Sequence, residues 1–177
     1  MTIRPLVLAL AAAAVPAALS AQHEHASHEH AAHHPARADS AGADTAFAAL
    51  QARGRVHMGV DQYTSTHRFD ALPNGGRIEL QRDTDDAVDV ATIRAHLRGI
   101  ADAFAAGDFN TPAAVHMREV PGAAVMAARR AHIRYAYRDL PRGGEVRIVT
   151  ADAEALAAIH AFMAFQRGDH RAGGESQ

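Results

Sequence analysis

The chain carries one pattern twice, as Phe69-Asp-Ala-Leu-Pro-Asn-Gly-Gly-Arg-Ile-Glu-Leu-Gln81 and as Tyr137-Arg-Asp-Leu-Pro-Arg-Gly-Gly-Glu-Val-Arg-Ile-Val149. The copies match at a constant offset of 68 residues, with an aromatic residue, Leu, Pro, two Gly and two alternating aliphatic residues in register. Each copy predicts two strands joined by a hairpin, since paired Gly residues permit positive φ where the chain reverses.

Each copy is followed by apolar residues at helical spacing, which predicts one helix after each hairpin. The first stripe comprises Val90, Ile93, Leu97, Ile100 and Phe104, and the second comprises Leu156, Ile159, Met163 and the neighbouring Phe162. The expected N-caps are Asp83 or Asp85 in the first copy and Thr150 or Asp152 in the second. Gly107 and Gly168 suit the helix ends.

These elements predict an α+β fold in which duplicated ββα units form a four-stranded antiparallel sheet with two helices on one face. The two repeats, 60–108 and 130–170, belong to a single domain over 43–171. The connection 109–130 is expected to be irregular. A short helix over 44–53, ended by Gly54, is expected before the first repeat.

Residues 1–21 have the features of a secretion signal. Arg4 is positive, an apolar stretch runs from Leu6 to Ala18, and small residues suit cleavage after Ser20 or Ala21. That stretch is too short for a transmembrane helix, and no later segment is apolar enough to cross a bilayer. We therefore expect a periplasmic or secreted protein with no membrane span after signal cleavage.

Residues 22–42 are rich in His, Ala, Ser and Glu and lack apolar periodicity, so we expect a disordered tail. Imidazole is the commonest metal ligand in proteins, and a flexible run of this kind binds zinc, copper or nickel with low specificity. The tail histidines are His23, His25, His28, His30, His33 and His34.

Composition rules out several chemistries. The chain has no Cys, so it forms no disulfide, thiol nucleophile or thiolate metal site. All 18 basic residues are Arg, so no Lys is present for a Schiff base or a Walker-type phosphate loop. The formal charge of -2 argues against nucleic acid as a partner.

Strand periodicity makes a specific prediction about His67. Side chains alternate along a strand, so His67 shares a face with Phe69. The duplication matches His67 with Tyr135 and Phe69 with Tyr137, on a strand face that is apolar in the second copy. His67 is therefore expected to face the core, where its ring nitrogens need either a hydrogen-bonding partner or a metal ion.

Two His-Met pairs lie outside the predicted repeat helices. His57-Met58 precedes the first strand, and His116-Met117 lies in the connection, with Met126 nine residues later. Imidazole and thioether without thiolate favour copper, particularly Cu(I), whereas zinc would prefer an added carboxylate. Methionine in loops also fills gaps in ordinary packing. Four other histidines are expected to lie outside any site: His96, His132, His160 and His170.

The sequence offers less support for an enzyme. It contains no Gly-x-Ser-x-Gly, His-Glu-x-x-His or Gly-x-Gly-x-x-Gly motif. The side chains of Ser65-Thr66-His67 alternate along the predicted strand and cannot converge. A domain that binds a small molecule or another exported protein without metal is the main alternative to metal binding.

The sequence Met58-Gly-Val-Asp-Gln-Tyr-Thr-Ser-Thr-His67-x-Phe69, then Leu-Pro-x-Gly-Gly-Arg-Ile-Glu-Leu-Gln-Arg82, Val115-His116 and Val120-Pro-Gly, resembles a family of small exported bacterial proteins of unknown function. The resemblance covers roughly residues 52–171. Some members carry an aspartate carbamoyltransferase label. That enzyme is a longer two-domain α/β protein with a Ser-Thr-Arg-Thr phosphate loop and a catalytic Lys, so its activity is not expected here.

Together these features predict an exported metal-binding protein that captures or delivers copper, with zinc as the alternative metal. The expected site joins His67 on the sheet to Met58 and His57 before it, and to His116, Met117 and Met126 in the connection. The tail would bind metal loosely and pass it inward. Another exported protein is a further candidate partner.

Overall fold

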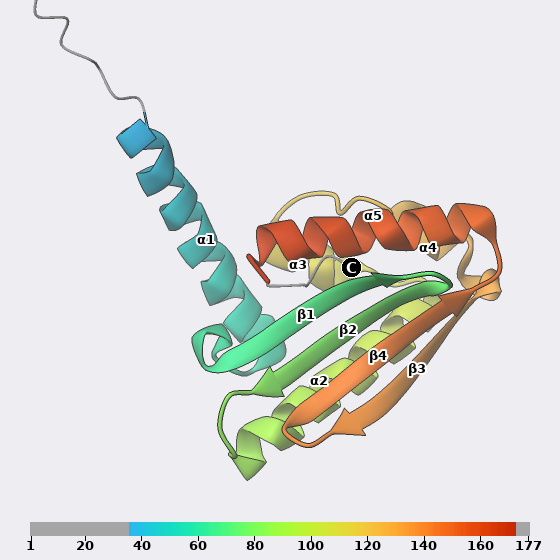
Figure 1. Ribbon diagram of the computed structural model, residues 1–177, viewed down its shortest axis with the longest axis horizontal. Coiled ribbons are helices and arrows are strands. Elements are labelled where there is room, and N and C mark those ends of the chain that lie inside the picture. The colour runs from blue at the N-terminus through green and yellow to red at the C-terminus, as the bar shows by residue number, and fades with distance from the viewer. Residues whose placement is uncertain (1–35, 173–177) are drawn as a thin grey trace, which may run out of the picture. The chain divides into compact units, whose positions relative to one another are not determined.

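The structure, a computed structural model, describes residues 36–172, with side chains from residue 42 onward. The predicted signal and all six tail histidines lie outside the described residues. Four strands form one antiparallel sheet in the order β1-β2-β4-β3 (Figure 1). Their bounds are β1 Ser65–Leu72, β2 Gly75–Arg82, β3 Ile133–Leu140 and β4 Gly143–Thr150. The predicted α+β class and the pairing of the two hairpins in one sheet are confirmed.

The paired glycines do not form the hairpin turns, contrary to our prediction. The chain reverses at Pro73-Asn74, where Leu72 pairs directly with Gly75, since Pro and Asn favour turn conformations. The glycines are instead the first residues of the two central strands. A Cβ on Gly75 would overlap the carbonyl oxygen of Ile148, and one on Gly76 would press on side chains of the last helix. The close approach of neighbouring elements therefore explains these glycines.

Two helices cover one face of the sheet: α2 (Ala87–Ala106) and α5 (Ala153–Asp169) (Figure 1). The residues of the two predicted apolar stripes are buried, except for Leu156, which is only partly buried. The core between helices and sheet includes Phe69, Ile78, Leu80, Ile93, Phe104, Val146, Ile148, Ile159, Phe162 and Met163. Burying such side chains contributes about 1.5–3 kcal/mol each. None of the described helices is long and apolar enough to cross a membrane.

Each repeat helix also contacts the hairpin turn of the other repeat. Arg94 on α2 donates from its Nη2 to the carbonyl oxygen of Leu140 at 2.8 Å. His160 on α5 lies with its Nε2 at 2.9 Å from the carbonyl oxygen of Leu72. These two contacts occupy equivalent places in the duplication, so the two repeats hold each other in place.

Aspartates cap both repeat helices, at Asp86 and Asp152. The side chain of Asp86 accepts hydrogen bonds from the backbone N–H groups of Val88 and Asp89, both at 3.0 Å. Asp152 is one of the two caps predicted for α5, whereas Asp86 replaces the predicted Asp83 or Asp85. Gly107 ends α2 as expected, but α5 continues through Gly168 to Asp169.

We expect Asp86→Ala to lower the free energy of unfolding by about 1 kcal/mol, because two N–H groups lose their acceptor. Asp85→Ala is the matched control, since the neighbouring Asp85 carboxylate is exposed and the capping bonds of α2 come from Asp86. Urea denaturation at pH 7.5 measures both variants. Equal effects of the two substitutions would contradict the capping role.

Helix α1 runs from Ala36 to Met58 and is longer than the predicted 44–53. It includes residues 36–42, which composition assigns to the tail, and it passes through Gly54 without ending. A Cβ on Gly54 would overlap the side chain of Gln62, so this glycine permits close packing beside the helix. The connection is more regular than predicted, because it contains α3 (Asn110–His116) and α4 (Ala123–Ala128).

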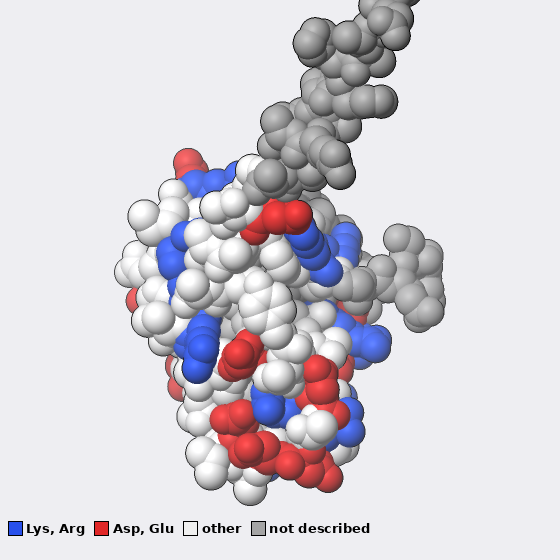
Figure 2. All heavy atoms as spheres, turned by 90° about the vertical axis from the view of Figure 1, so that its left-hand side faces the viewer, with Lys and Arg blue, Asp and Glu red and all other residues white. Residues whose placement is uncertain are grey.

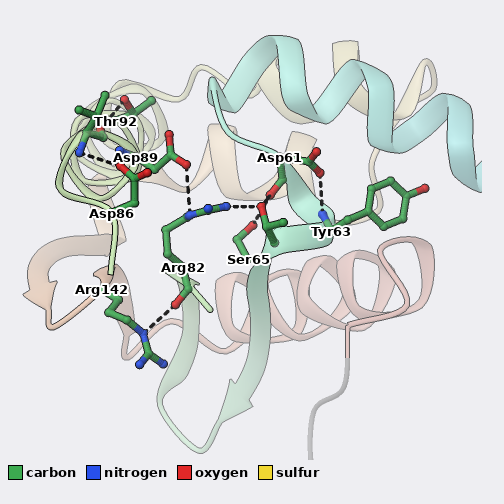
Figure 3. A network of polar contacts seen from close by, with 10 residues as sticks. Asp61, Tyr63, Ser65, Arg82, Asp86, Asp89, Thr92 and Arg142 are labelled. Atoms are coloured by element: carbon green, nitrogen blue, oxygen red, sulfur yellow. Dashed lines mark hydrogen bonds and ion pairs between the residues drawn. The ribbon is translucent and has the colours of Figure 1, made fainter. Parts of the chain in front are cut away.

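A polar network ties the end of β2 to the start of α2 (Figure 3). Arg82 forms an ion pair from its Nε to Asp89 at 3.2 Å and donates to the hydroxyl of Thr64. Arg142 donates in turn to the carbonyl oxygen of Arg82 at 2.8 Å. Acidic side chains gather at this end of the molecule (Figure 2), and include Asp83, Asp85, Asp86 and Asp89.

Candidate functional site

A cavity of about 70 Å³ lies between the helix-covered face of the sheet and helices α1, α2, α3 and α5. This volume holds an ion or a molecule of a few heavy atoms, since one water needs about 10–15 Å³ on this measure. Its polar or sulfur-containing lining residues are Met58, His67, His96, Thr111, His116, Gln166 and His170. The other lining residues are apolar or Gly, so no carboxylate or guanidinium of the described residues lines this cavity.

His67 comes from β1 and faces inward, as its strand phase predicted. Its ring stacks on Phe69 with centroids 5.5 Å apart. Burial lowers the pKa of His67 to about 3, with smaller contributions from the charges of His170 and His96. The imidazole is therefore neutral at neutral pH, with a lone pair on one ring nitrogen.

His170 follows directly after α5 and lies 5.4 Å from His67 between ring centroids. Its Nδ1 is 3.2 Å from Oε1 of Gln62. If Nδ1 carries the proton and donates to Gln62, Nε2 keeps its lone pair. Burial lowers the pKa of His170 to about 4, and the charge of His116 adds to this effect while Asp169 opposes it.

His96 enters the cavity from α2. Burial lowers the pKa of His96 to about 4, the charge of His57 lowers it further, and a hydrogen bond with the backbone of His57 raises it. His57 itself is exposed. The end of α1 therefore places His57 beside His96, outside the residues that line the cavity.

His116 is held at both ring nitrogens. Its Nδ1 contacts the carboxylate of Asp169, and its Nε2 lies 3.0 Å from Oε1 of Gln166 on α5. Arg118 donates to the other oxygen of Asp169 at 2.6 Å. This chain of contacts fixes the His116 ring in the cavity wall and occupies both of its nitrogens.

The duplication supplies an internal comparison for this cavity. In the strands, His67 is equivalent to Tyr135. In the helices, His170 is equivalent to Phe104, because each lies the same number of residues after the aspartate that caps its helix, Asp152 or Asp86. Phe104 and Tyr135 contact each other edge to face, with centroids 5.9 Å apart. The contact between Phe104 and Tyr135 is thus an ordinary aromatic pair. The equivalent contact, with the two repeats exchanged, is the pair of imidazoles His67 and His170.

The structure brings together three of the predicted site residues, Met58, His67 and His116, in one cavity. It places the two others from the connection elsewhere. The side chain of Met117 is exposed at 73%, and Met126 is fully buried in the apolar core at 0%. Neither lines the cavity, because α3 ends between His116 and Met117 and α4 packs Met126 inward.

Sequence reasoning missed His96 and His170, although the position of His96 carried a signal. His96 lies three residues after Ile93 and four before Ile100, on the edge of the buried stripe. The match of His170 with Phe104 becomes visible only when both helices are counted from the caps that the structure shows, Asp86 and Asp152. His132 is exposed, and His160 contacts a hairpin turn, so both lie outside the cavity as expected.

Comparison of the chain with protein-family models, with curated proteins and with solved structures finds no match. Any proposal about the function of this protein therefore rests on the geometry of the described residues.

Proposed function

We propose that the cavity binds one Cu(I) ion through the imidazoles of His67 and His170 and the thioether of Met58, and that the protein captures or delivers copper. The observation that carries this proposal is the pair of imidazoles that stands where the other repeat has an aromatic pair. A histidine pair in place of two packed aromatic rings adds little to core packing, whereas it supplies two nitrogen ligands in a cavity that Met58 also lines.

The chemistry of the lining favours a soft, singly charged ion. Neutral imidazoles are competent ligands without losing a proton, and the lowered pKa values of His67 and His170 keep them neutral. The described lining of the cavity holds no carboxylate, which is the ligand that zinc would add to histidine. Thioether and imidazole together suit Cu(I).

The proposed site has three protein ligands. Within residues 36–172, no three His, Asp or Glu side chains are arranged to hold one metal ion. The proposed set is accordingly limited to two imidazoles, and the thioether of Met58, which lines the same cavity, is its third ligand. Two imidazoles bonded at about 2.0 Å to a trigonal ion would place their ring centroids roughly 5.5 Å apart. The rings of His67 and His170 are 5.4 Å apart.

Export would place this site in the periplasm or outside the cell, as the signal-like residues 1–21 predict. The histidines between His23 and His34 would then collect metal with low specificity before it reaches the cavity. Zinc is the alternative metal for both parts of the chain.

A second candidate function is the binding of a small uncharged molecule without metal. Apolar side chains such as Phe69, Leu97 and Phe162 make up much of the cavity wall. The ring of His67 would then serve as a hydrogen-bonding partner for the molecule. Metal titration separates this alternative from the copper proposal.

The double substitution His67→Tyr with His170→Phe tests the proposal, because it copies the aromatic pair that the other repeat already contains. The variant is expected to fold and to bind Cu(I) at least about 100-fold more weakly, since even changes behind the metal ligands cost about 10–100-fold. Cu(I) affinity is measured under reducing conditions by competition with a chromogenic chelator. The six tail histidines are replaced by Asn in every sample.

Two methionine variants provide the matched control. Met58→Leu should weaken Cu(I) binding, whereas Met126→Leu should not, because Met126 lies in the core outside the cavity. Unchanged Cu(I) affinity in the His67→Tyr, His170→Phe variant would refute the copper site. Absence of Cu(I) binding in the parent protein would leave the small-molecule function as the better candidate.

A further inference from the structure

A second cavity, of about 430 Å³, lies beside the first and is separate from the proposed copper ligands. One wall is a stripe along α1 that comprises Ala43, Ala46, Phe47, Leu50 and Arg53. The opposite wall comprises His116, Arg118, Gly168, Asp169 and Arg171, from the end of α3 and the end of α5. We name this cavity the arginine groove, after its three guanidinium groups.

Each of the three guanidinium groups contacts the protein. The Nε of Arg53 donates to the carbonyl oxygen of Val115 at 2.6 Å. Arg118 lies over the ring of Phe165 at 4.6 Å, and Arg171 lies over the ring of Phe47 at 4.2 Å. Stacking favours one orientation of the guanidinium plane, which reduces the side-chain entropy that is lost when a ligand binds.

Among the described residues at the arginine groove, the positively charged groups outnumber the negatively charged groups. Two carboxylates face the three guanidinium groups: Asp169 pairs with Arg118 at 2.6 Å and Asp44 pairs with Arg171 at 3.0 Å. Asp169 also contacts the ring of His116. Arg53 donates to a backbone carbonyl rather than to a carboxylate, and each guanidinium has five N–H groups.

We propose that the arginine groove binds a small organic carboxylate. The carboxylate would pair with the N–H groups of Arg118 and Arg171 that the aspartates leave open, since a guanidinium fork matches a carboxylate in shape and charge. The carbon part of the ligand would lie against Ala43, Ala46 and Phe47 on α1. This proposal is independent of copper, because none of its ligand-contacting residues is a proposed copper ligand.

Benzoate and its uncharged counterpart benzamide are the probes. Metal-free protein is titrated with each at low salt, and the side-chain Nε–Hε signals of the arginines are followed by NMR. Benzoate should bind with a dissociation constant of about 1 mM, shift the signals of Arg53, Arg118 and Arg171, and bind more weakly as salt is added. Benzamide should bind at least about tenfold more weakly, because it lacks the charge that the guanidinium groups recognise.

Arg118→Gln and Arg171→Gln should each weaken benzoate binding about tenfold, because each removes a charge-assisted pair. Arg134→Gln is the control, since Arg134 is exposed on β3 away from the groove. Melting curves verify that the variants are folded. Equal binding of benzoate and benzamide would overturn the proposal, as would benzoate binding that both groove variants leave unchanged or that is absent from the parent protein.

Discussion

Lowering the pH from about 7.5 to about 4.5 is expected to reduce the free energy of unfolding by several kcal/mol. Burial lowers the pKa of His67 to about 3 and those of His96 and His170 to about 4, whereas an unfolded histidine titrates near 6.5. Between these values the unfolded chain binds protons that the folded chain does not. Stability therefore rises with pH in this window and is fully present above about pH 6.5.

His67 alone should contribute about 3 kcal/mol to this loss, because one pKa unit corresponds to about 1.4 kcal/mol. The other two imidazoles act in the same direction. Urea denaturation at several pH values measures the effect in metal-free protein. The His67→Tyr, His170→Phe variant should show a much flatter pH profile, and the exposed-site control His132→Asn should not. A parent profile without a slope between about pH 7 and pH 4.5 would contradict the neutral histidine cluster.

Gly122→Ala is expected to lower the free energy of unfolding by about 2–5 kcal/mol. Gly122 precedes α4 with φ at +83°, and a Cβ there would overlap the carbonyl oxygen of Ala158 on α5. The left-handed conformation costs a residue with a Cβ about 1–2 kcal/mol, and overlap with backbone adds about 1–3 kcal/mol. The backbone of α5 cannot move aside without disturbing the core.

Gly99→Ala is the matched control and should have the opposite sign. Gly99 lies within α2, and nothing lies within 4 Å of where its Cβ would be. Alanine there should stabilise the protein by about 0.5–1 kcal/mol, because glycine is the weaker helix former. Urea denaturation of the two variants at pH 7.5 measures the difference. Similar stabilities of the two variants would show that α4 adjusts its position relative to α5.

The orientation of His67 toward the core was predictable from the sequence. Side chains alternate along a strand, and the matching strand face of the other repeat is apolar. The convergence of Met58 and His116 had weaker grounds, since it rested only on the expectation that irregular segments meet. His170 lies at a helix end, where local sequence does not show whether the terminus packs or frays. Met117 and Met126 lie outside the cavity because of where α3 ends and how α4 packs, which the sequence did not show.

The sequence by itself determined the duplicated hairpins, the two helices that follow them, the α+β class and the inward faces of β1 and β3. These features depend on local periodicity and on an internal match that fixes register. Only the tertiary structure decided the role of the paired glycines, the length of α1 and the entry of His170 into the cavity. Each of these depends on contacts between segments far apart in the chain, which no local pattern encodes.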